Sequence, residues 1–442
     1  MGKTAIQWCT HVLNFLRGCD AVSAGCAHCW AAATAVRFSQ PGAAFDGLAR
    51  RKPLPSGRGS LAVWTDKPVQ QIPDAMLEAL AGGAPRLVFV NSVSDTFHAD
   101  VPFEYIAAWW GFMAASKHTF QIVTKRAKRM REFFRWSKDR GGFGGWIRAA
   151  ADLCDAHHRE DGRWAKAYDR LGRVPVSGQE PLALPNVWLL VSTENQETYD
   201  ERVAELLQCP AVVRGISAEP LLGPIELGLG RWIRLPRPVV SDFAGVPGLP
   251  PPIVAEAGVY RARSNALGAL WVSLPGGDLG IKPGEYELLP DLDWAIIGGE
   301  SGSGCRPCEL QWVRDLTYQI SEYNRDREDN GYTAPFLKQL GGAAVDRQNG
   351  LVGALHPAKP KTDPWVRSRL RDGHGGDEAE FPASLCGYRH FPIPRTVRPV
   401  HLTVSPWVLL VALAFLVPWA AVMLEGRRSS RPLPPSAFGY VQ

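Results

Sequence analysis

Short apolar runs recur along the chain, and polar residues close each of them. Most precede a stretch with the composition of a helix, such as residues 30–38 and 102–116. Near-continuous apolar strands that alternate with helices are typical of a parallel sheet covered on both faces. The pattern predicts an α/β fold, a partial (β/α) barrel of the TIM type. The predicted strands are 6–15, 87–91, 120–124, 187–192, 212–217, 294–297 and 335–338, with 61–64 as one further candidate.

Polar side chains stand where these strands end. In a (β/α) barrel, the carboxyl ends of the strands face the active site. We therefore expect these side chains to converge on one site. They are Asp95, Lys125, Glu194, Asn195, Glu219 and Glu300.

Two insertions interrupt the predicted domain, which covers residues 1–392. Residues 137–184 are polar, with a helical piece from Trp146 to Tyr168. Residues 228–293 are rich in Pro and Gly, and their short apolar runs predict a small β module.

The end of the chain has a different composition. After a linker, 393–405, residues 406–424 are nineteen residues without a charge, long enough to span a bilayer, and a polar tail, 425–442, follows. The arginines after the segment predict a cytoplasmic tail by the positive-inside rule. We also expect the main domain in the cytoplasm, and a single membrane span cannot leave both ends on the same side. A tail anchor with membrane contact and an incidental apolar extension both stay open.

The 442 residues carry a net charge of +5, which favours contact with a polyanion without requiring it. Nine cysteines, an odd number and widely scattered, exclude a disulfide framework. No secretory signal opens the chain, so we expect a cytoplasmic protein.

Three of the cysteines form the most informative motif. Cys19, Cys26 and Cys29 follow a C-x6-C-x2-C spacing, with Gly18 and Gly25 placed to let the backbone turn. Three thiolates without a fourth predict a [4Fe–4S] cluster that leaves one iron open for S-adenosylmethionine. The alternatives are a zinc site completed by His28 or His11 and unpaired core cysteines.

The chain resembles an uncharacterised family found widely in bacteriophages and bacterial mobile elements. The resemblance covers residues 5–392 apart from the insertions, and it implies a partial barrel of the radical-SAM kind. This chain departs from the family's pattern at Cys9, Trp30, Cys305 and Cys308. Its cysteine spacing is also longer than the C-x3-C-x2-C of most radical-SAM enzymes. The matching stretches are 18–29, 89–102, 118–126, 186–196, 219–225, 298–307, 335–339 and 375–392.

The resemblance also implies roles at the cofactor. Gly298-Gly299-Glu300 is similar to the element that holds the methionine ammonium in radical-SAM folds, and Asp95 is the alternative for that role. Lys125, Arg126 and Asn195 would hold the carboxylate or the ribose of S-adenosylmethionine. Glu219 is a further candidate for cofactor binding. For each residue, the alternative is an ordinary ion pair or turn at a strand end.

Residues 124–136 contain six cations and three aromatics. This mixture suits phosphate contact with base stacking, or else an amphipathic helix with a basic solvated face.

We derive three functional hypotheses. The first is a radical-SAM enzyme that takes electrons from a flavodoxin or ferredoxin and acts on a nucleic acid or nucleotide. The second is a zinc-stabilised nucleic-acid-binding protein, and the third is a membrane-tethered accessory protein without catalysis.

Overall fold

The computed structural model describes most of the chain up to residue 392, within a compact unit that runs from Met1 to Pro394. The predicted linker, apolar segment and polar tail all lie outside the described residues. No helix in the described part is both long and apolar enough to cross a membrane. The described ranges are 1–54, 59–157, 162–177, 182–227, 231–241, 253–264, 270–275, 277–301, 304–325, 332–346, 376–381 and 383–392.

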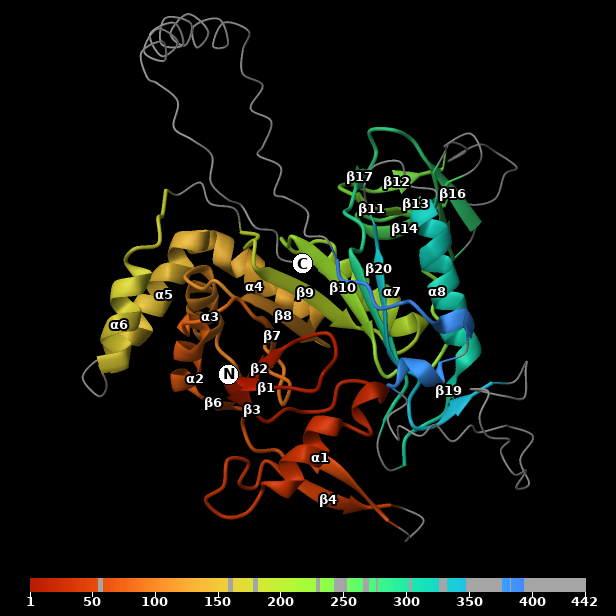
Figure 1. Ribbon diagram of the computed structural model, residues 1–442. Helices are drawn as coiled ribbons and strands as arrows, with labels where there is room; N and C mark the ends of the chain where they lie inside the picture. The colour runs from red at the N-terminus through yellow and green to blue at the C-terminus, as the bar shows by residue number, and fades with distance from the viewer. Residues whose placement is uncertain are drawn as a thin grey trace, which may run out of the picture. The chain divides into compact units, whose positions relative to one another are not determined.

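The core is an eight-stranded sheet in which seven parallel strands follow one another in chain order (Figure 1). The first strand is antiparallel and lies at one edge. This arrangement confirms the α/β class with a parallel sheet. Across the sheet the strands are β1 (Gly2–Lys3), β2 (His11–Leu13), β7 (Leu87–Val90), β8 (Thr119–Thr124), β9 (Val187–Ser192), β10 (Val213–Ala218), β18 (Trp294–Gly298) and β20 (Ala334–Gln339).

Both faces of the sheet are apolar and buried, as the sequence predicts. All six residues of β9 are buried, for example. One face packs against the helices, and its contacts form the larger core cluster. The helices are α1 (Trp30–Arg37), α2 (Pro73–Leu77), α3 (Phe103–Ala114), α4 (Ala127–Asp139), α5 (Gly142–His157), α6 (Gly162–Leu171), α7 (Gln196–Leu206) and α8 (Leu310–Arg325).

The sheet curls around Trp8 on its other face. The Trp8 ring lies 4.6 Å from the ring of Phe89 in β7 and 6.1 Å from that of Trp294 in β18. In a flat sheet these strands, four positions apart, would be separated by about 19 Å at the usual spacing. Among the described residues β2 and β20 are not paired, so no closed barrel forms.

Two predicted strands were wrong in extent or place. Residues 6–15 form only the short strand β2, because Trp8 and Cys9 turn into the core in front of it. Residues 61–64 belong to a hairpin outside the main sheet, in which β5 (Ser60–Trp64) pairs with β4 (Ala49–Pro53). Helix α1 packs against this hairpin. Nearby, β3 (Leu16–Arg17) pairs with β6 (Gln70–Gln71).

The first insertion forms two helices, α5 and α6, where the sequence predicts one helical piece. Helix α5 packs tightly on α3, because Gly111 leaves room for the Trp146 carbonyl that a β-carbon would meet at 2.3 Å. In α4, Phe133 and Phe134 are buried in the core. The structure therefore favours the amphipathic-helix interpretation of 124–136 over base stacking.

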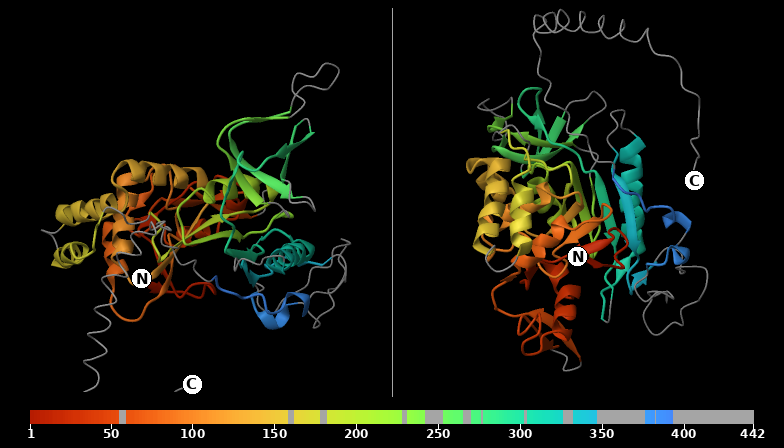
Figure 2. Two further views of the ribbon diagram at one scale, coloured as in Figure 1. Left: turned by 90° about the horizontal axis from the view of Figure 1, so that it is seen from above. Right: turned by 60° about the vertical axis from the view of Figure 1, so that its left-hand side comes forward.

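The second insertion is a small β module, as predicted. Its five strands form an antiparallel sheet in the order β16-β15-β14-β11-β17, shown in green in Figure 2. The strands are β11 (Arg231–Leu235), β14 (Gly258–Ser264), β15 (Leu270–Leu274), β16 (Gly277–Ile281) and β17 (Glu287–Leu288); the pairs β12 (Val239–Val240) with β13 (Val254–Ala255), and β19 (Cys308–Glu309) with β21 (Ala344–Val345), complete the described strands.

Candidate functional site

The three cysteines lie on a loop that follows β2 and β3 and ends at the first turn of α1. Gly18 starts the loop with φ +96°, a left-handed conformation that favours glycine. A short 3-10 turn, Ala24–Cys26, carries the second cysteine, and Cys29 directly precedes α1. All three cysteines are partly exposed.

Four other cysteines belong to the core. Burial raises the pKa of the Cys9, Cys154, Cys209 and Cys308 thiols to about 12, so these thiols stay neutral. Cys308 lies in β19, so the Cys305–Cys308 pair does not form a second exposed loop motif of the same kind.

Asp95 and Arg126 form the first support of the cysteine loop. Asp95 accepts hydrogen bonds from the Thr124 hydroxyl at 2.7 Å and from the Phe97 and Lys125 amides, and it pairs with Arg126 at 3.0 Å. Arg126 in turn donates to the Cys19 sulfur at 3.7 Å. Protein donors therefore occupy the Asp95 carboxylate, which leaves it poorly placed to bind a cofactor ammonium.

Groups around Cys19 both raise and lower the pKa of its thiol. Burial and the Asp95 carboxylate raise the pKa of Cys19 to about 12, and Arg126 partly opposes them. A metal ion would remove this barrier, because a coordinated thiol loses its proton.

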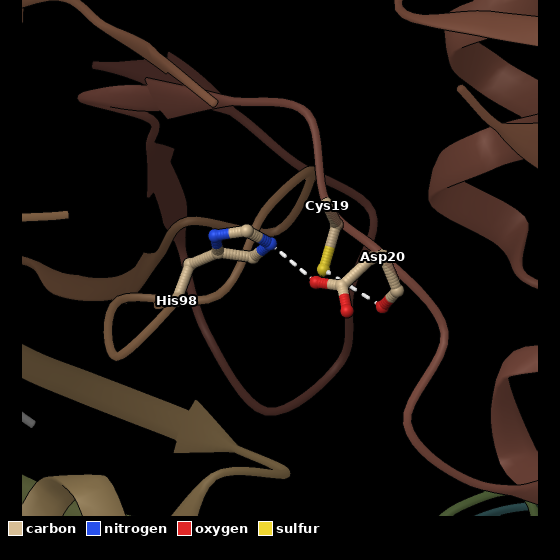
Figure 3. Close-up of side chains that lie close together, drawn as sticks. All are labelled: Cys19, Asp20 and His98. Atoms are coloured by element: carbon tan, nitrogen blue, oxygen red, sulfur yellow. Dashed lines mark hydrogen bonds and ion pairs between the residues drawn. The ribbon is translucent and has the colours of Figure 1, made fainter. Parts of the chain in front are cut away.

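Cys19, Asp20 and His98 bring potential metal ligands within 4.8 Å of one another (Figure 3). The Asp100 amide, however, donates to His98 Nδ1 at 3.2 Å. The ring proton must then sit on Nε2, which faces the Asp20 carboxylate. In this tautomer Nε2 carries a proton and has no lone pair for a metal, and it forms an ion-pair contact with Asp20.

Glu194 forms the second support. Its carboxylate is 1% exposed, accepts from the Ser23 hydroxyl at 2.7 Å and pairs with Arg202 at 3.0 Å. Lys125 Nζ lies 3.7 Å away. Burial alone would raise the pKa of Glu194, but Lys125, Arg202 and Ser23 together lower it below its usual range.

Gly25 allows this contact. Its φ is not left-handed, unlike that of Gly18, and its role is close approach: a β-carbon there would lie 2.3 Å from Glu194 Oε1. Gly18 therefore permits a turn of the backbone, as expected, whereas Gly25 is needed for the close approach to Glu194.

Glu300 forms the third support, through Arg306. The Arg306 Nε donates to Glu300 at 3.0 Å and its Nη2 at 2.6 Å, while Nη1 donates to the Ala24 carbonyl at 2.8 Å. Burial opposes ionisation of Glu300, but the hydrogen bonds from Arg306 lower its pKa below the usual range. Glu300 therefore anchors the loop instead of presenting a free carboxylate.

Gly298 and Gly299 serve close packing between strands. A β-carbon on Gly299 would lie 2.3 Å from the Leu340 carbonyl oxygen, and one on Gly298 would contact Gln339 at 3.3 Å. Both glycines thus have a structural reason to be there, independent of a ligand.

Asn195 and Glu219 are also engaged by the protein. Asn195 caps α7, because its side chain accepts from the Thr198 amide in a capping box. Glu219 pairs with Lys338 and accepts from Gln339. Lys125 is 21% exposed in its side chain and is the predicted residue with most freedom to meet a ligand.

The zinc alternatives receive little support. His11 begins β2, at the end of the strand opposite the cysteine loop. His28 directs Nδ1 towards Glu300, at 3.7 Å. Among the described residues, Cys19, Asp20 and His98 place donor atoms within 4.8 Å of one another, whereas the three loop thiols are not gathered at that spacing.

Sequence reasoning missed the roles of Ser23, Arg202 and Arg306. Arg306 was part of the resemblance, but only the fold reveals that it reaches Ala24, 282 residues earlier.

The family model described as "Protein of unknown function (DUF5131)" matches residues 3–369. The chain belongs to this family. The match runs from the first strand through both insertions and α8. No curated protein and no solved structure matches the chain.

Proposed function

We propose that the protein is a radical-SAM-type iron–sulfur enzyme whose cluster is held by Cys19, Cys26 and Cys29. The observation that carries the proposal is the three-thiol loop, held at the carboxyl ends of parallel strands by Asp95, Glu194 and Glu300 through their partners. Three thiolates suit a cubane cluster with one open iron better than a closed zinc site, which takes four donors. The curled parallel sheet is compatible with the partial barrel of radical-SAM enzymes.

The chain's own residues have two tasks at the cysteine loop in this proposal. Arg126 directs a positive donor at the Cys19 sulfur, which tunes the electronic properties of a bound cluster. Glu194 and Arg306 fix Ser23 and Ala24, so the turn that carries Cys26 is held by the protein itself. When bound, the cluster would supply the electron that cleaves S-adenosylmethionine to a 5′-deoxyadenosyl radical.

The sequence suggests several residues for cofactor recognition, and we keep only Lys125 among them. Asp95, Asn195, Glu219 and Glu300 are held by protein partners at hydrogen-bond distance, whereas the Lys125 ammonium lies at a longer 3.7 Å from Glu194. We therefore propose Lys125 for the cofactor carboxylate.

The test is cleavage of S-adenosylmethionine by anaerobically purified protein with a chemical reductant. We expect 5′-deoxyadenosine from the parent and from Cys386→Ser, because Cys386 is exposed and lies outside the loop. Cys26→Ala should form none. Absence of product in the parent with an intact cluster would favour a non-catalytic protein, and a colourless protein with zinc would favour the nucleic-acid-binding alternative.

A further inference from the structure

The segment that directly follows the cysteine loop is basic. Residues 30–71 contain six cations and two carboxylates, a net charge of +4. This segment includes α1 and the β4–β5 hairpin, which we call the basic arm. The base of the arm touches the start of the cysteine loop, since Arg17 donates to the Ala44 carbonyl and Leu48 lies against Gly18.

The cations at the centre of the basic arm are exposed. Arg50, Arg51 and Lys52 follow one another in β4, and all three are exposed. Among the described residues none of them forms an ion pair, and Arg51 has only a 3.4 Å hydrogen bond to Ser60. By contrast, Arg126 and Arg306 at the site are both paired with carboxylates.

The geometry of a strand distributes this charge to both sides of the hairpin. Successive side chains of a strand point to opposite faces, so Arg51 points away from Arg50 and Lys52. The hairpin lies at the margin of the unit, beyond the main sheet, at the bottom of Figure 1 and of the right-hand view in Figure 2. A two-stranded ribbon with cations on both faces suits a nucleic acid, whose groove has phosphates on either side. An acidic protein would meet only one of these faces.

An exposed aromatic side chain lies where the basic arm joins the cysteine loop. Trp30 is the first residue of α1, directly follows Cys29, and is 58% exposed. Exposed aromatics beside a basic surface stack on bases with little regard to sequence.

We propose that the basic arm binds the phosphates of a nucleic acid and that Trp30 stacks on a base next to the cysteine loop. Presentation of that base for reaction rests on the proposed function, whereas the binding itself does not. The substrate class of the enzyme is then a nucleic acid, not a free nucleotide, because three exposed cations on the hairpin suit the successive phosphates of a backbone.

The first experiment measures binding of the full chain to fluorescein-labelled oligonucleotides, single-stranded DNA, RNA and a DNA duplex, by anisotropy across a salt series. The variant R50Q/R51Q/K52Q is compared with K138Q/K166Q/R173Q, which removes three exposed cations from α4, from α6 and from the turn after α6. We expect the first variant to lose about tenfold or more in affinity and its salt slope to become shallower by about 2–3. The control should keep the parent's slope. Equal losses in both variants, or equal slopes, would overturn the proposal.

The second experiment isolates the stacking contact. Trp30→Ala should weaken binding to a single strand about tenfold, with the salt slope unchanged, because no charge is removed. Unchanged affinity would refute the role of Trp30.

Two further measurements separate this proposal from the proposed function and from a protein partner. Cys26→Ser should bind oligonucleotides like the parent, so failure of the cluster chemistry leaves the basic arm intact. If 5′-deoxyadenosine forms but no oligonucleotide binds, the basic arm proposal alone fails. If R50Q/R51Q/K52Q binds oligonucleotides normally but takes electrons from reduced flavodoxin more slowly, the basic arm is a docking surface for an acidic electron donor and our proposal is wrong.

Discussion

The contact between Gly25 and Glu194 gives the sharpest test of how the cysteine loop is held. In Gly25→Ala the new methyl group would lie 2.3, 2.6 and 2.8 Å from the Oε1, Cγ and Cδ atoms of Glu194. Glu194 cannot easily retreat, because Arg202 and Ser23 hold its two oxygens and the side chain is 1% exposed. The loop must therefore shift, and the Ser23 hydrogen bond is strained or lost.

The magnitude follows from these two effects. Overpacking of a buried contact costs about 1–3 kcal/mol. A hydrogen bond to a charged group contributes about 1.5–3 kcal/mol. Because a shift of the loop relieves part of the overlap, we expect Gly25→Ala to lower the free energy of unfolding by about 2–4 kcal/mol.

The assay is urea unfolding of the apo protein in a double-mutant cycle. Gly82→Ala is the control, since a β-carbon there meets nothing within 4 Å. Glu194→Ala removes the clashing atoms, so Gly25→Ala should cost little in that background, whereas in Glu194→Gln, which keeps the shape, the cost should remain. A cost for Gly25→Ala that is equal in the parent and in Glu194→Ala, or no larger than that of Gly82→Ala, would refute this account of the loop.

Three further predictions address other contacts of the site. Glu300→Gln should lower stability at pH 7 by about 1–3 kcal/mol. Because Arg306 lowers the pKa of Glu300, the parent should lose this stability as the pH falls below the ordinary carboxyl range. Urea midpoints at pH 7 and at about pH 3 should therefore differ less in the variant than in the parent. Asn195→Ala should cost about 1 kcal/mol in thermal unfolding through loss of the helix cap, with unchanged affinity for S-adenosylmethionine; a selective loss of that affinity would restore its cofactor role. Arg126→Gln should make the reduction potential of the cluster more negative in a redox titration, because a positive donor is removed from Cys19, whereas Arg129→Gln, whose guanidinium binds carbonyls of the loop after β7, should not.

Much of the main sheet could be predicted from the sequence, because its parallel strands are buried on both faces and read as continuous apolar runs. Strand β9 lies where the sequence places it, and Glu194 follows its end. The apolar run 61–64 was misplaced because its four apolar residues do not reveal which strand they pair with. Both strands of this pair pack against α1, a contact that the run itself does not reveal.

Asp95, Glu194 and Glu300 lie near the cysteine loop, as their places at strand ends predict, but their partners could not be predicted. Glu194 receives its hydrogen bond from Ser23, 171 residues earlier in the chain. A glutamate after two glycines predicts a cofactor ligand at Glu300, yet the Arg306 guanidinium occupies this carboxylate. A carboxylate at a strand end looks the same in the sequence whether its partner is a cofactor or another side chain.

The most direct test of the account is the iron and acid-labile sulfide content of the anaerobically purified, reconstituted chain. We expect about four of each per chain in the parent and in Cys386→Ser, and a loss of both in variants that lack Cys19, Cys26 or Cys29. A chain that binds a single zinc ion and no sulfide, or that keeps its iron without the three loop cysteines, would contradict it.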